Sequence, residues 1–139
     1  METRVDWIEC NKRRIVKQVY IDEAMIKSLL NTSTNKLKSE KILILNNTTA
    51  SSKITLAYDA LRELLEALAL KNGFKIYNHE CYTAFLKDVM NESSTGDEFD
   101  EIRKLRNSIN YYGKEISVQD TRKTLKEIKS LIKKIKKRF

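Results

Sequence analysis

The sequence predicts an all-α fold, an up-and-down bundle of about five to six helices. Its 139 residues contain no proline and only three glycines, whereas β-sandwiches and barrels need many turn residues. Apolar residues also recur at helical spacing in several segments that short polar stretches separate. A chain of this length buries one core, so we expect residues 1–139 to form a single helical domain.

The first third of the chain, residues 1–46, is expected to hold the N-terminal helices. From Val5 to about Leu30, apolar residues keep helical spacing between charged ones, which predicts one long amphipathic helix. Residues 31–35 are small and polar. Ser33 or Thr34 could therefore cap a second helix that runs to about residue 45.

The central part, residues 53–113, is expected to hold the core helices. A helix over 53–72 carries two apolar strips, which is typical of a central helix, and Gly73 can end it. A further helix over 78–89 begins at an asparagine cap. A third, over 97–112, ends at Gly113 and has an acidic first turn that suits the helix dipole.

The segment 117–139 predicts a basic C-terminal helix with an apolar face opposite a lysine-rich one. It contains nine of the 27 basic residues and two of the 19 acidic ones, in a chain of formal net charge +8. Such a cluster attracts phosphate-rich partners without reading their sequence. An ordinary solvated helix face is the alternative interpretation.

The two cysteines, Cys10 and Cys81, follow no CxxC spacing, and no apolar signal segment is evident. We therefore expect two unpaired thiols and a cytoplasmic location. The longest apolar runs, residues 42–45 and 67–70, are far too short to span a bilayer, so a membrane is not an expected partner.

One arginine of the helix over 97–112 breaks its amphipathic pattern. At about 100° per residue, Arg106 falls between the apolar positions Phe99 and Ile102. An unpaired buried guanidinium is costly, so Arg106 needs either a carboxylate partner or an anionic ligand. Glu66 or Asp59 of the central helix could be that carboxylate.

Polar side chains beside Arg106 form a strip on the same helix face. Arginine offers bidentate donors to phosphate and tyrosine can stack on a base, so this strip has the chemistry of an RNA site. It consists of Arg103, Arg106, Asn107 and Asn110, and it ends in Tyr111 and Tyr112.

The segment from Leu105 to Gly113 resembles the signature of the HEPN superfamily, in which an Arg-Asn, Arg-Asp or Arg-His pair precedes a histidine by four to six residues. Arg106 and Asn107 match its start. The upstream residues 58–70, Gly73, Tyr77–Glu80 and Phe85–Leu86 also look like those of small archaeal HEPN proteins. The resemblance covers about residues 53–136, roughly 60% of the chain.

This resemblance implies a homodimer of helical bundles whose motifs face each other. Many HEPN proteins are metal-independent ribonucleases, often toxins paired with a small nucleotidyltransferase. Carried over, Arg106 would hold the scissile phosphate and Asn107 would orient the site. Tyr111 and Tyr112 stand where the family has its histidine, and tyrosine is a poor general base at neutral pH.

Two functions are therefore expected. In the first, the protein acts on or binds RNA, as a ribonuclease with Arg106, Asn107, Tyr111 and Tyr112 at its site. In the second, it is a noncatalytic module that binds a nucleotidyltransferase, a nucleotide or a nucleic acid. No cofactor or metal is expected, since His79 is the only histidine and has no ligand at metal spacing. A surface or packing role is the prediction for His79.

Overall fold

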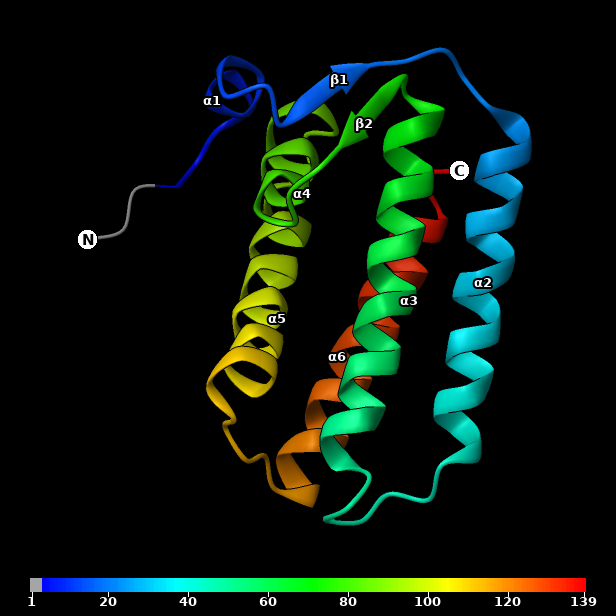
Figure 1. The fold of residues 1–139 in the computed structure, drawn as a ribbon, viewed down its shortest axis with the longest axis vertical. Helices are drawn as coiled ribbons and strands as arrows, with labels where there is room; N and C mark the ends of the chain where they lie inside the picture. Colours follow the sequence, from blue (N-terminus) through cyan, green and yellow to red (C-terminus); the bar gives the residue numbers. More distant parts are fainter. Residues whose placement is uncertain (1–3) are drawn as a thin grey trace.

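A computed structural model describes residues 4–139. Its helices run up and down beside one another, as an all-α bundle does, and a two-stranded sheet closes one end (Figure 1). The predicted fold class is confirmed. The elements are α1 (Trp7–Lys12), β1 (Val16–Gln18), α2 (Glu23–Ile42), α3 (Ala50–Lys71), β2 (Phe74–Ile76), α4 (Glu80–Ala84), a π-helical turn (Phe85–Val89), α5 (Ser93–Tyr112) and α6 (Val118–Lys136).

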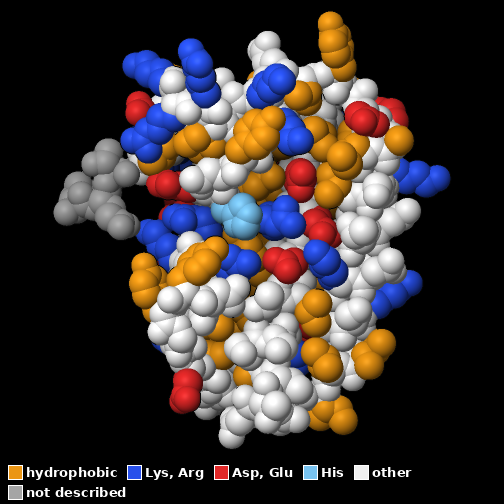
Figure 2. Space-filling view, in the orientation of Figure 1, with side chains coloured by type: hydrophobic (Ala, Val, Ile, Leu, Met, Phe, Trp, Pro, Cys, Tyr) orange, Lys and Arg blue, Asp and Glu red, His pale blue; other side chains and the backbone are white. Residues whose placement is uncertain are grey.

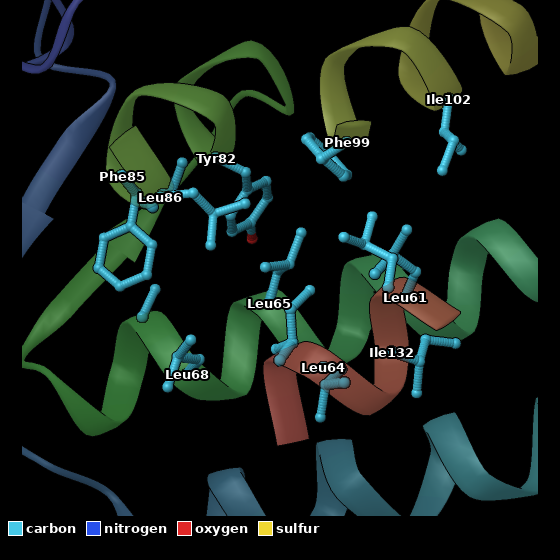
Figure 3. Packing of buried hydrophobic residues seen from close by; sticks show 14 of the residues in the cluster. Leu61, Leu64, Leu65, Leu68, Tyr82, Phe85, Leu86, Phe99, Ile102 and Ile132 are labelled. Carbon is cyan, nitrogen blue, oxygen red and sulfur yellow. The ribbon is translucent and has the colours of Figure 1, made fainter. Parts of the chain in front are cut away.

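Helix α3 is the centre of the bundle, as its two apolar strips predict. It lies between α2 on one side and α4 and α5 on the other, with α6 behind it (Figure 1). Buried residues occur all around it, because a helix that contacts neighbours on several sides has no wide polar face. Figure 3 shows its leucines 61, 64, 65 and 68 packed among Tyr82, Phe85, Phe99 and Ile132.

The predicted helix from Val5 to Leu30 is wrong. Helix α1 ends after six residues, and the positive φ of Arg14, 58°, turns the chain. Val16 then enters strand β1, which pairs antiparallel with β2 opposite Ile76. β-Branched side chains fit such a half-buried strand as well as a helix, so helical spacing alone misleads in this segment.

The predicted break at residues 31–35 is also wrong, because α2 runs through it without interruption. The hydroxyl of Ser33 is buried and donates to the carbonyl oxygen of Ala60 at 2.7 Å. The hydroxyl of Thr32 donates to Glu63 at 2.9 Å. These small polar residues are thus part of the contact of α2 with α3, where their hydroxyls find partners across the interface.

The predicted end of α5 and the predicted start of the C-terminal helix are confirmed. Gly113 ends α5 with a φ of 64°, a left-handed conformation that glycine adopts without a Cβ clash. Ser117 caps α6 by accepting a hydrogen bond from the backbone N–H of Asp120 at 3.0 Å. Within residues 4–139, no helix combines the length and apolar character that crossing a membrane requires.

Helix α5 begins at Ser93, four residues before its predicted start, so its acidic residues do not form the first turn. The prediction that they serve the helix dipole is wrong. They form ion pairs instead: Asp97 with Lys87, Glu98 with Lys134, and Asp100 with Arg103.

The expectation of unpaired cysteines is wrong as well. Cys10 of α1 and Cys81 of α4 form a disulfide, with their Cα atoms 6.1 Å apart. Both side chains are buried in the main apolar cluster. The residues lie 71 positions apart, so no local spacing could indicate the bond, which depends on how α1 docks against α4.

Candidate nucleic-acid interface

Arg106 reaches from α5 across to α3, where its guanidinium lies over the ring of Tyr58. The Cζ atom is 5.1 Å from that ring's centroid and 5.8 Å from the ring of Tyr111. With the Asn110 amide turned so that its oxygen faces the guanidinium, it accepts from Nε at 3.0 Å. The two rings and the amide therefore orient a half-buried cation without neutralising it.

The carboxylates predicted as partners of Arg106 do not pair with it. Glu66 accepts from Arg62 instead, at 3.1 Å. Within residues 4–139, no Asp or Glu oxygen, including those of Asp59, lies at ion-pair distance from Arg106. The charge of Arg106 is thus left for a ligand or for solvent, which corrects the internal ion-pair interpretation.

Tyr58 connects Arg106 to the only histidine of the chain. Its side chain is fully buried, and its hydroxyl oxygen lies 2.9 Å from Nδ1 of His79, at the start of α4. Burial raises the pKa of Tyr58 to about 12. The hydroxyl therefore keeps its proton throughout the neutral range.

His79 lies among cations. Burial, and then the positive charges of Arg62 and Arg106, lower the pKa of His79 to about 4, so its imidazole is neutral at pH 7. Asp59 acts on it in the opposite direction. Figure 2 shows the pale-blue histidine at the surface, near the middle of this face and between blue basic side chains.

The other edge of the polar strip faces a groove rather than α3. Asn107 and Tyr112 line this groove, which has a volume of about 800 Å³. Its cations already have carboxylate partners: Arg4 binds Asp88, Lys87 binds Asp97, and Arg103 and Lys104 share Asp100. The groove therefore carries little uncompensated positive charge, unlike the surface around Arg106.

The structure thus divides the residues predicted for the site. Arg106, Asn110 and Tyr111 lie together over α3. Arg103 is close enough to lower the pKa of His79 and also lines the groove. Asn107 and Tyr112 belong to the groove alone. The strip spans about 100° around the helix axis, so its two edges meet different neighbours, which explains this division.

The sequence predicts only a surface or packing role for His79 and no place in the site for Arg62. For Tyr58 it leaves two interpretations open, a side chain that lines the same cleft as Arg106 or one that packs in the core. No sequence signal joins them to Arg106, because they come from α3 and from the start of α4. The periodicity does place Tyr58 and Arg62 four residues apart, on one face of the central helix. It cannot tell which neighbour that face meets.

The groups assembled here are mainly hydrogen-bond donors. Guanidinium groups, a neutral imidazole N–H and the exposed hydroxyl of Tyr111 complement the oxygens of a phosphate. Among residues 4–139, no three His, Cys, Asp or Glu side chains converge as a metal site requires. Such a set of donors can bind an anion.

No family model, curated protein or solved structure matches this chain. The HEPN resemblance accordingly rests on the residues that match the family's signature, Arg106 and Asn107 above all.

Proposed function

We propose that this protein is a HEPN-like RNA-binding protein whose Arg106 holds a backbone phosphate. One observation carries the proposal: the guanidinium of Arg106 is oriented by Tyr58 and Asn110 but has no carboxylate at ion-pair distance within the described residues. A cation fixed in this way loses little entropy when a phosphate binds, and its fork of donors matches two phosphate oxygens.

Single-stranded RNA is the form of RNA that this surface fits best. The ring of Tyr111 lies beside the guanidinium and is 70% exposed. An exposed aromatic ring next to a phosphate-binding cation can stack on an unpaired base. Bases within a duplex are already stacked on their neighbours and are not free to stack on the ring of Tyr111.

The protonation states favour binding over cleavage. RNA cleavage without a metal requires a base that takes the proton of the 2′-hydroxyl as it attacks phosphorus, and an acid that protonates the departing 5′-oxygen. Tyr58 keeps its proton up to about pH 12, and Nδ1 of His79 is engaged by its hydroxyl. Neither group is available as that base.

Cleavage remains the second candidate function because of the position of Tyr111. Its hydroxyl lies 3.4 Å from Nη1 of Arg106, so the residue that replaces the family's histidine contacts the family's arginine. Solvent water would then take the proton of the 2′-hydroxyl as its oxygen attacks phosphorus, and Tyr111 would donate its proton to the departing 5′-oxygen. The products would carry a 2′,3′-cyclic phosphate and a 5′-hydroxyl.

The resemblance extends the proposal to assembly. It implies a homodimer in which two Arg106 surfaces face one RNA, and pairing with a small nucleotidyltransferase. Sedimentation of the purified chain, alone and with RNA, tests the dimer separately from the binding.

The decisive experiment compares the wild type with Arg106→Ala and with Arg122→Ala, using metal-free buffer and a labelled pool of single-stranded RNAs. Arg122→Ala removes the same charge from an exposed position of α6. We expect Arg106→Ala to weaken RNA binding roughly ten- to a hundredfold, as for the loss of hydrogen bonds to a charged group. Arg122→Ala should bind nearly as the wild type does.

Equal weakening in both variants would show that overall charge alone attracts RNA, and would refute the proposed site. Circular dichroism of each variant confirms that the fold persists. If the wild type also cuts RNA, the same gels report cleavage. Cleavage that is lost in Arg106→Ala and in Tyr111→Phe would establish the ribonuclease, whereas Tyr20→Phe, at a fully exposed tyrosine, is the matched control.

A further inference from the structure

The buried hydroxyl of Tyr58 determines which nitrogen of His79 carries the proton. Nδ1 of His79 is the hydrogen-bond partner of this hydroxyl among the described residues. A buried hydroxyl that donates to nothing loses free energy. The hydroxyl therefore donates to Nδ1, and a neutral imidazole that accepts at Nδ1 carries its own proton on Nε2.

The same Tyr58 side chain also determines where His79 lies relative to Arg106. The guanidinium lies over the face of the Tyr58 ring, and the imidazole binds the hydroxyl at its end. Tyr58 itself is held by Phe99, whose ring stacks on it with centroids 6.1 Å apart. One rigid, buried side chain thus positions two donors that come from different elements.

We propose that His79 is a second phosphate-binding residue of this surface, donating from Nε2 to the RNA phosphate that Arg106 holds. Tyr58 is the positioning residue, because it fixes both the tautomer of His79 and the place of the guanidinium. This inference rests on the proposed RNA-binding function and adds to it a residue for which the sequence predicts only a surface or packing role.

The charges that face His79 explain why a neutral donor suits this place. Arg62, Arg103 and Arg106 oppose protonation of the imidazole, and Asp59 favours it. When a phosphodiester binds, its negative charge offsets the arginines. The pKa of His79 should then rise, so that acidic conditions strengthen binding through a second full cation.

The single histidine makes the test direct, because its imidazole nitrogens give the only such signals in a ¹⁵N spectrum of the chain. In the free wild type, long-range ¹H–¹⁵N correlations should show the Nε2–H tautomer. Titration with a short single-stranded RNA of mixed sequence should shift the imidazole signals and raise the pKa of His79. A free protein with the proton on Nδ1 would overturn the assignment.

Variants then separate binding from positioning. His79→Ala should bind the RNA about tenfold more weakly than the wild type, whereas His79→Gln, which keeps an N–H donor, should recover part of this loss. Tyr58→Phe keeps the ring under Arg106 and removes only the hydroxyl, so its imidazole should show mixed tautomers and its affinity should fall severalfold.

The outcomes distinguish this inference from the function on which it rests. If His79→Ala binds RNA as tightly as the wild type while Arg106→Ala does not, His79 is not a phosphate ligand but the RNA site stands. If the wild type binds no RNA and its imidazole signals do not move, both proposals fail. The titration of the wild type uses no variant. The inference can therefore be refuted even if a variant fails to fold.

Discussion

Two basic residues of the bundle, one buried and one half-buried, differ in whether a carboxylate neutralises their charge. Lys53 of α3 is buried, ion-pairs with Glu40 at 3.0 Å and donates to the carbonyl oxygen of Leu43 at 2.6 Å. Arg106 has aromatic rings and an amide around it but no carboxylate at ion-pair distance in residues 4–139. A satisfied cation stabilises the fold, whereas a fixed and uncompensated one is available to an anion.

The ion pairs of a single residue, Glu40, lead to a prediction about stability. Its side chain is 2% exposed and lies between Lys53, at 3.0 Å, and Lys129, at 2.9 Å. Burial opposes its ionisation, but the ion pairs with Lys129 and Lys53 outweigh that effect and hold the pKa of Glu40 below its ordinary value. At pH 7, Glu40→Gln should lower the free energy of unfolding by about 3 kcal/mol, because it leaves buried Lys53 without its counter-charge.

The pH dependence has a definite sign. A carboxyl with a depressed pKa in the folded state stabilises above its unfolded pKa, near 4.5, and the stabilisation disappears as the pH falls through the folded value. The stability gap between wild type and Glu40→Gln should therefore narrow below about pH 4.5. Denaturant unfolding at several pH values measures it, with Glu101→Gln, at an exposed site, as the control. An equal gap at every pH would contradict the ionised pair.

Among the elements, the periodic helices α3 and α6 were predictable, whereas α1 and the course of α2 were not. Helices α3 and α6 carry an apolar pattern over some twenty residues each, and a pattern of that length admits no alternative to a helix. The chain from Trp7 to Gln18 is too short and too rich in β-branched residues for periodicity to decide. Its conformation depends on β2 and on the disulfide to α4.

The disulfide between α1 and α4 leads to a second prediction about stability. Replacing both Cys10 and Cys81 with Ser should lower the free energy of unfolding by about 2–4 kcal/mol, because the bond closes a long loop and restricts the unfolded chain. Thermal unfolding of the wild type with and without reductant measures the effect, and the double variant should not respond to reductant. Two free thiols in wild-type protein that was unfolded without reductant would contradict the bond.

Across the whole molecule, positive charge gathers on two separate surfaces. The buried residues of α6 pack against α3 from behind in the view of Figure 1, so its basic side chains point away from the contact of Tyr58 with His79. Charges on separate surfaces are largely screened from each other at physiological salt, where the Debye length is about 8 Å. Several basic side chains of α6 and of the residue after it form no ion pair within residues 4–139. They are Arg122, Lys123, Lys126, Lys133, Lys136 and Lys137.

This separation predicts different salt dependences. Lys126→Ala combined with Lys133→Ala should weaken RNA binding at about 50 mM salt and have little effect at about 200 mM, since these lysines act over a distance. Arg106→Ala should weaken binding at both salt concentrations, because it removes a direct contact. Filter binding across a salt series measures both slopes. A loss of affinity in the α6 variant that persists at high salt would place the RNA on α6.

Features that depend on neighbours within a turn or two could be predicted from the sequence: the all-α class, the central helix, the end of α5 at Gly113, and the polar strip around Arg106 on one helix. Which residues that strip meets depends instead on contacts between distant parts of the chain. Tyr58, His79 and Arg106 come from three elements, and Cys10 meets Cys81 across 71 positions. Helical periodicity and caps are local and can be read along the chain, whereas contacts between elements depend on how all the apolar faces pack at once.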